Sequence, residues 1–307
     1  DPDFAFSSGM QDILFYFRDL DVYMMPTNGY YYAGEIPNYL ASTMALVVKD
    51  NEFPDTGVGK VKRLPDSKKE KNLDGTRAVI DIDPIEEICT VKKTKFLFGD
   101  RATRSRGYYH FSDEDERQEY VEQWLVDNLE MELSDVEIRN ESLDLNFGSA
   151  DTVYYSGVLK GSEIMTSIPN GFILNPGGIM GTQVSFYDTE DRVANIYIPE
   201  SKSYKHTITV NIPEGYTVEG TENLEFNEHY FTNRRWAYGE TSDDAKYMTE
   251  SESRAEFVSS VTVTDNQIRI EIDEFYVEGF YPKEGMAELQ KVVNAAYEFF
   301  IAKIKFV

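Results

Sequence analysis

Short segments in which apolar and polar residues alternate follow one another from about residue 136 to residue 272. The clearest is 206–212, where isoleucine and valine alternate with threonine and asparagine. Successive side chains of a strand point to opposite faces, so this pattern is typical of a strand with one buried and one solvated face. Segments 257–263 and 268–272 flank a polar turn and predict an antiparallel hairpin. The chain is therefore predicted to be mainly β.

Two amphipathic helices are expected beside these strands. Apolar residues recur at helical spacing in two segments, which predicts helices near 114–128 and 283–302. Ser112 is the predicted N-cap of the first helix, and Trp124 is expected to be buried between that helix and a sheet. The predicted fold class is α+β, mainly β: an antiparallel β-sandwich with two packed amphipathic helices.

Changes in composition divide the 307 residues into three predicted parts. Residues 1–49 contain short strands, and residues 78–307 form the β-sandwich-like domain. Residues 50–77 are rich in Asp, Lys, Gly and Pro, and we predict that they form a linker. The chain opens on Asp-Pro-Asp without an initiator Met, which we interpret as a processed or truncated polypeptide.

The charge of the chain excludes several classes of partner. Its formal net charge of -25 repels phosphate backbones, so nucleic acid is not an expected partner, and anionic membrane surfaces are disfavoured. The densest basic run, 60–71, is interrupted by Asp66 and Glu70 and is interpreted as a solvated loop. No segment is apolar over the length that a transmembrane helix needs, so no transmembrane segment is predicted.

Residues with catalytic or metal-binding chemistry are few. The single cysteine, Cys89, follows Glu86 and Glu87, whose charges would raise its thiol pKa, so an inert thiol is expected. His110, His206 and His229 have no second ligand at metal-binding spacing and are predicted to face solvent or lie at strand edges. No catalytic centre, metal site or cofactor is therefore predicted.

Two aromatic clusters are the candidate binding residues. Exposed aromatic rings beside polar groups can stack on sugars or dock peptides. The competing interpretation is that these rings belong to the core, where alternating aromatic residues of strands commonly pack. The candidates are Tyr30, Tyr31, Tyr32, Tyr230, Arg234, Arg235 and Trp236.

Four motifs carry a resemblance to a known family. Residues 22–27 (VYMMPT) are similar to a Y-x-D-P-T motif, and 34–37 (GEIP) to a G-x-L-P motif. Residues 191–198 (DRVANIYI) and 212–219 (IPEGYTVE) are similar to E-R-x-x-P-I and L-P-x-G-Y-x-V-E. In this order they resemble the C-terminal part of multidomain transglutaminase-like proteins of Bacteroidota. The resemblance implies that 1–49 is a β remnant of a transglutaminase-like core, followed by a β-rich domain of unknown function.

The same resemblance implies a protein without catalytic activity. The aspartate position of the family's Cys-His-Asp triad is Met25 here, the histidine position falls near residues 10–12 without a His, and the cysteine would lie upstream. Met cannot orient or stabilise an imidazolium. The expected function is a binding or scaffolding module in the periplasm or cell envelope, with a protein, peptide or glycan as partner. The alternatives are an accessory part of a cysteine transglutaminase or protease, and a carbohydrate-binding module.

Overall fold

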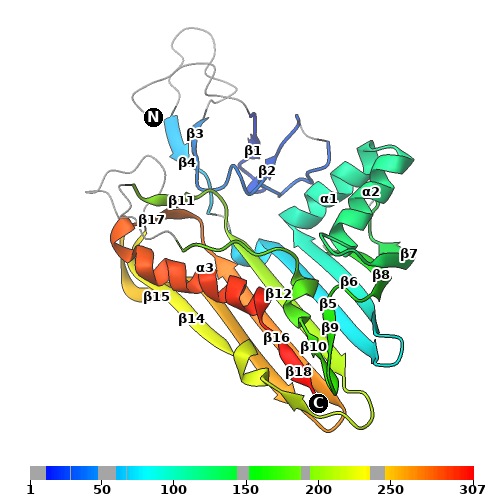
Figure 1. Ribbon diagram of the computed structural model, residues 1–307. Coiled ribbons are helices and arrows are strands. Elements are labelled where there is room, and N and C mark those ends of the chain that lie inside the picture. Colours follow the sequence, from blue (N-terminus) through cyan, green and yellow to red (C-terminus); the bar gives the residue numbers. More distant parts are fainter. Residues whose placement is uncertain are drawn as a thin grey trace.

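The computed structural model describes residues 12–27, 29–47, 60–66, 68–143, 152–187, 194–235 and 246–307, without the side chains of 60, 232–235 and 246–252. Eight strands form the largest sheet: β5 (Asn72–Asp83), β6 (Ile88–Gly99), β7 (Glu132–Arg139), β8 (Thr152–Gly161), β12 (Lys202–Asn211), β14 (Phe226–Arg235), β15 (Lys246–Val263) and β16 (Gln267–Tyr276). Their order across the sheet is β14-β15-β16-β12-β5-β6-β8-β7 (Figure 1).

The sheet is mixed, whereas an antiparallel arrangement was predicted. β5 and β12 run parallel, and every other neighbouring pair is antiparallel. The parallel pair arises because the chain leaves the sheet after β8 and returns through β12 to lie beside β5. The predicted hairpin is confirmed as β15 and β16, with Val263 opposite Ile268. The mainly β composition of the fold is confirmed as well.

Smaller sheets complete the β structure. The first contains β9 (Met165–Ile168), β10 (Gly171–Leu174), β13 (Val218–Glu219) and β18 (Ile304–Phe306) in the order β13-β18-β10-β9. The remaining strands pair as β1 (Phe15–Phe17) with β2 (Val22–Met24), β3 (Met44–Val47) with β4 (Lys60–Arg63), and β11 (Ile196–Ile198) with β17 (Gly279–Tyr281). Short 3-10 helices span Lys69–Lys71, Pro176–Met180, Thr221–Leu224 and Lys283–Gly285.

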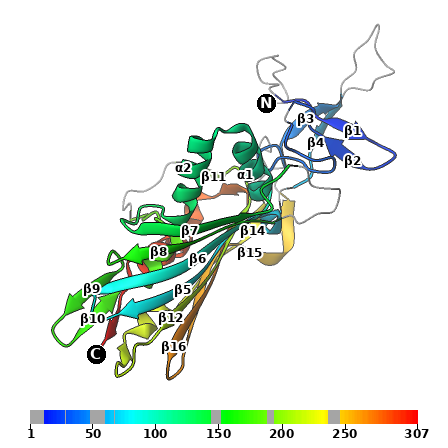
Figure 2. The same ribbon diagram turned by 90° about the vertical axis from the view of Figure 1, so that its right-hand side faces the viewer.

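Helices cover one face of the large sheet. α1 (Asp100–Phe111) and α2 (Glu114–Leu125) lie beside β6 and β8, and α3 (Met286–Ile301) lies over β14 and β15 (Figures 1 and 2). The four-stranded sheet shares a hydrophobic core with α3 and the large sheet, so the second layer is part helix and part strand. The opposite face of the central strands carries exposed polar residues such as Arg77, Lys92 and Arg269, as expected for a sheet with one solvated face.

Both predicted helices are confirmed, with one shift and one omission. The N-cap of α2 is Asp113, not Ser112: its side chain accepts a 3.0 Å hydrogen bond from the Glu116 amide, and the Glu116 carboxylate accepts one from the Asp113 amide. The helix α1 was not predicted from the sequence. The residues that α1 buries are mostly small or polar, such as Ala102, Ser105 and Gly107, so no apolar stripe marks it.

The predicted linker is wrong at its C-terminal end. β4 occupies residues 60–63 within it, and β5 begins at Asn72 rather than at Ala78. Residues 72–77 therefore belong to the centre of the large sheet. Their polar side chains, including buried Asp74 and Thr76, gave them the composition of a loop.

Candidate functional site

A band of polar side chains crosses the covered face of the large sheet. Register places Lys95, Thr76 and His206 side by side on β6, β5 and β12. The next row contains Asp74, Tyr204 and Glu274 on β5, β12 and β16. We call these six residues the polar band: Asp74, Thr76, Lys95, Tyr204, His206 and Glu274. All except Tyr204 are at most 7% exposed, which is rare for ionisable side chains.

Apolar residues border the polar band. On β5, β12 and β16 the next row contains Ala78, Ile208 and Ile270, which belong to the main hydrophobic core. Leu97, on β6 beyond Lys95, belongs to a second apolar cluster with Leu125 of α2. The band is therefore a polar stretch inside the protein interior and not part of its surface.

An ion pair lies at the β6 end of the band. Lys95 Nζ lies 2.6 Å from Asp74 Oδ1 and 5.3 Å from the centre of the Trp124 ring. Lys93, one position along the same face of β6, is 3% exposed. Burial and the charge of Lys95 lower the pKa of Lys93 to about 8, against the opposing attraction of Asp127 and Asp74. Two buried cations are thus balanced by two carboxylates.

Glu274 carries a carboxyl group that burial keeps partly protonated at neutral pH. Burial raises its pKa to about 7, and a hydrogen bond from Tyr276 opposes this rise. The charge of Asp74 acts in the same direction as burial. Burial also raises the pKa of the Tyr204 phenol to about 12, so this phenol is neutral at physiological pH. Carboxyl groups with a pKa shifted to near 7 are common at functional sites.

His206 is buried, whereas the sequence analysis placed it in solvent or at a strand edge. Its strand is central, with β5 on one side and β16 on the other, and the imidazole faces the core. Burial and the charges of Lys95 and Lys93 hold its pKa well below the usual value, so the ring is neutral. Within the described residues, His206 Nδ1 and Thr76 Oγ1 are buried without a hydrogen-bond partner.

A cavity of about 420 Å³ lies over the polar band. Its floor contains every band residue except Thr76, together with Tyr276. Its other walls come from Asp127, from Val293 and Ala296 of α3, and from residues 180–184. The volume falls within the range of about 300–1,000 Å³ that is typical of small-molecule sites.

Residues 180–187, which we call the strap, are fixed at both ends. The Asp127 carboxylate accepts a 3.1 Å hydrogen bond from the Thr182 amide. Gly181 adopts φ +96°, and a Cβ there would lie 2.4 Å from Asp127 Oδ2, so a larger residue does not fit. On α3, the side chain of Asn294 both accepts from the Phe186 amide and donates to its carbonyl, at 2.6 and 3.0 Å. The cavity wall is therefore held in place.

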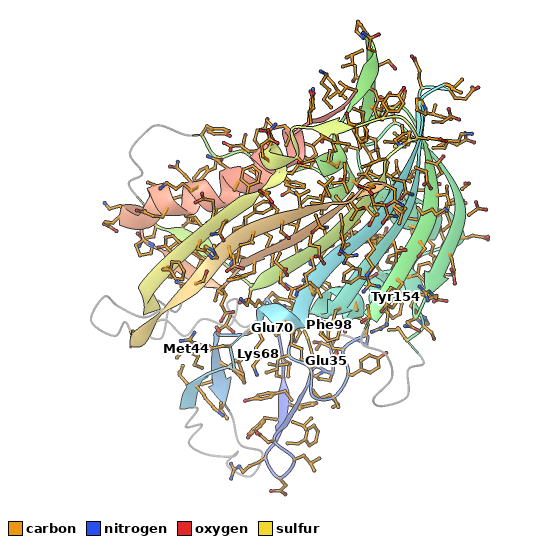
Figure 3. All side chains as sticks on the ribbon, turned by 90° about the horizontal axis from the view of Figure 1, so that it is seen from below. Glu35, Met44, Lys68, Glu70, Phe98 and Tyr154 are labelled. Carbon is orange, nitrogen blue, oxygen red and sulfur yellow. The ribbon has the colours of Figure 1, made fainter. Side chains whose placement is uncertain are left out.

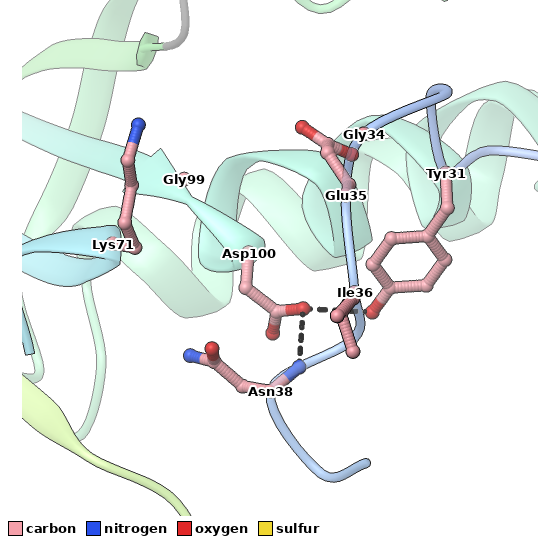
Figure 4. Close-up of a pocket in the computed structure, with 8 residues that line it drawn as sticks. All are labelled: Tyr31, Gly34, Glu35, Ile36, Asn38, Lys71, Gly99 and Asp100. Carbon is pink, nitrogen blue, oxygen red and sulfur yellow. Dashed lines mark hydrogen bonds between the residues drawn. The ribbon is translucent and has the colours of Figure 1, made fainter. Parts of the chain in front are cut away.

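The predicted tyrosine cluster packs the N-terminal segment against α1. Tyr31 is 8% exposed and its hydroxyl donates to Asp100 Oδ1 over 2.9 Å, beside a small cavity of about 200 Å³ (Figure 4). Tyr32 donates to the Leu143 carbonyl, and the Tyr30 ring lies against Gly107. In Figure 3, Glu35 of the same segment lies near Phe98, at the end of β6. These contacts assign the three rings to packing rather than to an exposed platform.

The second predicted cluster is described only in part, and its two described rings differ: Phe231, which neighbours Tyr230 in this cluster, is 57% exposed. Tyr230 is 3% exposed and packs on Tyr281, with ring centres 5.2 Å apart. Arg234 and Arg235 lie on β14, and their side chains are outside the described part of the structure, as is Trp236.

The predictions made from the sequence for Cys89, His110 and His229 hold in part. Cys89 is fully buried, and burial alone, not the neighbouring glutamates, raises its thiol pKa to about 12. His110 is exposed in the last turn of α1, and not at a strand end. His229 lies 2.9 Å from the Glu256 carboxylate. Across the described ranges, no group of three or more His, Cys, Asp or Glu residues could hold a metal ion.

The polar band was missed although the sequence contains a signal for it. On the buried side of β6, Cys89 and Val91 are followed by Lys93 and Lys95, and on β16 three isoleucines are followed by Glu274. β5 and β12 show the reverse order along the chain, with polar residues first and apolar residues after them. Ionisable residues that continue the buried side of several strands indicate a polar site within the sheet.

Comparisons with protein families and with curated proteins found no match to this chain. No protein-family model matches the chain. No curated protein has a significantly similar sequence. In the described residues, no helix is long and apolar enough to cross a membrane.

Proposed function

We propose that this chain is a binding module without catalytic activity, and that it holds a small polar organic ligand in the cavity over the polar band. The observation that carries the proposal is the placement of His206: a buried imidazole on the cavity floor whose Nδ1 has no hydrogen-bond partner among the described residues. Leaving a buried polar atom unpaired costs about 1–3 kcal/mol of stability. A bound ligand offsets that cost.

Burial of the neighbouring charges supports the same proposal. An ion pair such as Lys95 and Asp74 contributes little to stability when it replaces apolar side chains of similar size. Glu274, on the cavity floor, also lies in a part of the sheet where isoleucine or valine would pack without desolvation cost. Side chains that lower stability and line a cavity are typical of binding sites.

The remaining parts of the proposal rest on sequence motifs. The absence of catalysis follows from Met25 at the position of the triad aspartate and from Cys89, a buried thiol with a raised pKa. The similarity of residues 22–27, 34–37, 191–198 and 212–219 to transglutaminase-like proteins supports a C-terminal module of such a protein, with residues 1–49 as the core remnant. A periplasmic or cell-envelope location belongs to the same proposal.

A thermal-shift screen tests the binding function. The wild-type chain is heated with sugars, polyols, amino acids and carboxylic acids, each at millimolar concentration. At least one compound is expected to raise the melting temperature of wild type, because it binds only the folded state. The same compound should not stabilise His206→Leu, while the exposed control His110→Leu should respond like wild type. If no compound stabilises wild type, or His206→Leu responds equally, the proposal is wrong.

A further inference from the structure

We infer that the ligand is a neutral saccharide of one or two rings, with its hydroxyl groups on the polar band and a C–H face against the strap and α3. This inference rests on the proposed binding function and names its ligand class. The ligand class is inferred from three properties of the cavity: its charge balance, its arrangement of hydrogen-bonding groups, and the apolar side chains that the strap and α3 contribute to its wall.

The charges around the cavity are already balanced. Lys95 is paired with Asp74, and the carboxylate of Asp127 attracts Lys93. His206 is neutral, and burial favours the neutral form of Glu274. A carboxylate or phosphate ligand would meet Lys95 already paired with Asp74, and Asp127 and Asp74 would repel it. An amine would compete with Lys95 and Lys93. Desolvating a charged ligand without a free counter-ion is unfavourable, so a neutral ligand fits best.

Hydrogen-bonding groups of both kinds lie next to each other on the floor. Asp74 accepts, the protonated carboxyl of Glu274 both donates and accepts, and Lys95 donates, while a neutral imidazole such as His206 donates at one nitrogen and accepts at the other. A hydroxyl group also donates and accepts at once, so adjacent hydroxyls match such a mixed surface. A pyranose ring presents several of them along its edge, whereas a simple alcohol or amide presents only one such group.

The opposite wall carries apolar side chains beside the polar Thr182 and Gln183 of the strap. Met180 and Val184 of the strap and Val293 and Ala296 of α3 face the cavity without hydrogen-bonding side chains. The C–H face of a sugar ring can pack on this wall while the hydroxyls bond to the floor. The two phenols on the floor, Tyr204 and Tyr276, add flat rings with polar tips, a combination that suits an amphipathic ligand.

Calorimetric titration with matched sugars tests the ligand class. The probes are glucose, galactose, mannose, maltose and cellobiose. Charged counterparts of the first two are glucuronate and galacturonate as anions, and glucosamine and galactosamine as cations. At neutral pH, a neutral sugar is expected to bind wild type at least about tenfold more tightly than its charged counterparts. His206→Leu and Glu274→Leu are each expected to weaken binding by about tenfold or more, as expected for a lost buried hydrogen bond, and His110→Leu is the unchanged control.

The outcomes separate this inference from the proposed function. Tighter binding of a uronate or an amino sugar overturns the neutral ligand and leaves the binding function standing. Failure of every sugar, with stabilisation by another compound of the screen, also overturns only the saccharide. If neither sugars nor any other compound binds, both the saccharide and the binding function are overturned. Should His206→Leu fail to fold, Glu274→Leu alone decides whether the site is the cavity over the polar band.

Discussion

Lys95 Nζ lies 2.6 Å from Asp74 Oδ1, on adjacent strands of the sheet, with side chains only 9% and 6% exposed. This pair joins the polar band to the second apolar cluster, where Trp124 lies over the Lys95 ammonium. Both charges are largely shielded from bulk water, so each depends on the other.

Breaking this pair on one side should destabilise the protein strongly. Lys95→Met leaves Asp74 buried and unpaired, and we expect it to lower the free energy of unfolding by about 3–5 kcal/mol. The double variant Lys95→Met with Asp74→Asn should recover most of this loss, because no buried charge remains. Guanidinium unfolding of wild type, both single variants and the double variant measures the coupling. Additive losses would show that the two side chains do not interact.

The raised pKa of Glu274 predicts a pH dependence of stability. The carboxyl group is protonated in the folded state below about pH 7, but in the unfolded state only below about pH 4.5. The contribution of Glu274 to the free energy of unfolding is therefore fully present below pH 4.5. It falls by up to about 3 kcal/mol as the pH rises towards 7. Tyr276, Tyr204 and Asp74 face this group.

The variant Glu274→Gln isolates that effect. His206 acts in the opposite direction, since its lowered pKa makes the folded state more stable as the pH rises through the usual histidine range. The unfolding free energy of wild type minus that of Glu274→Gln should fall from pH 4.5 to pH 7, because only wild type loses stability through this group. A difference that stays constant across this window would show that Glu274 has an ordinary pKa.

Two neighbouring residues of α2 should differ in their contribution to stability. The sequence predicts a largely buried Trp124. Its side chain is partly exposed and packs against the second apolar cluster, whereas Leu125 is fully buried. Leu125→Ala should cost about 2–5 kcal/mol. Trp124→Ala should cost less than Leu125→Ala, because part of its ring is already in contact with water. A thermal melt of each variant provides the comparison, and a larger loss for Trp124→Ala would contradict the packing described for α2.

The thiol of Cys89 should be unreactive while the protein is folded. Burial raises its pKa to about 12, so almost no thiolate exists at neutral pH. Iodoacetamide is expected to modify Cys89 only after unfolding, and the chain should neither hydrolyse peptides nor transfer amines to glutamine. Met25→Asp should restore no activity and should lower stability, since residue 25 is 4% exposed. Transamidation that disappears in Cys89→Ala would refute this account.

The sequence predicted elements whose periodicity is local. The helices α2 and α3 carry clear apolar patterns and were predicted to within a few residues. The turn between β15 and β16 was predicted as well, but β15 begins at Lys246 rather than at residue 257. β5 was cut short because Asp74 and Thr76 are buried polar residues, which sequence patterns assign to loops. The site could not be assembled from the sequence, because the parallel pairing of β5 with β12 brings Thr76 beside His206 across a long stretch of chain.

The most direct test of the proposed site uses the three histidines of the chain. In ¹H–¹³C spectra, the ring signals of His110, His206 and His229 can be assigned with single His→Leu or His→Gln variants. On addition of a neutral sugar that binds in calorimetry, we predict that the His206 signal shifts and saturates with the calorimetric affinity, while His110 and His229 stay unchanged. Binding that leaves His206 unmoved, or that shifts His110 or His229 instead, would contradict a ligand site over the polar band.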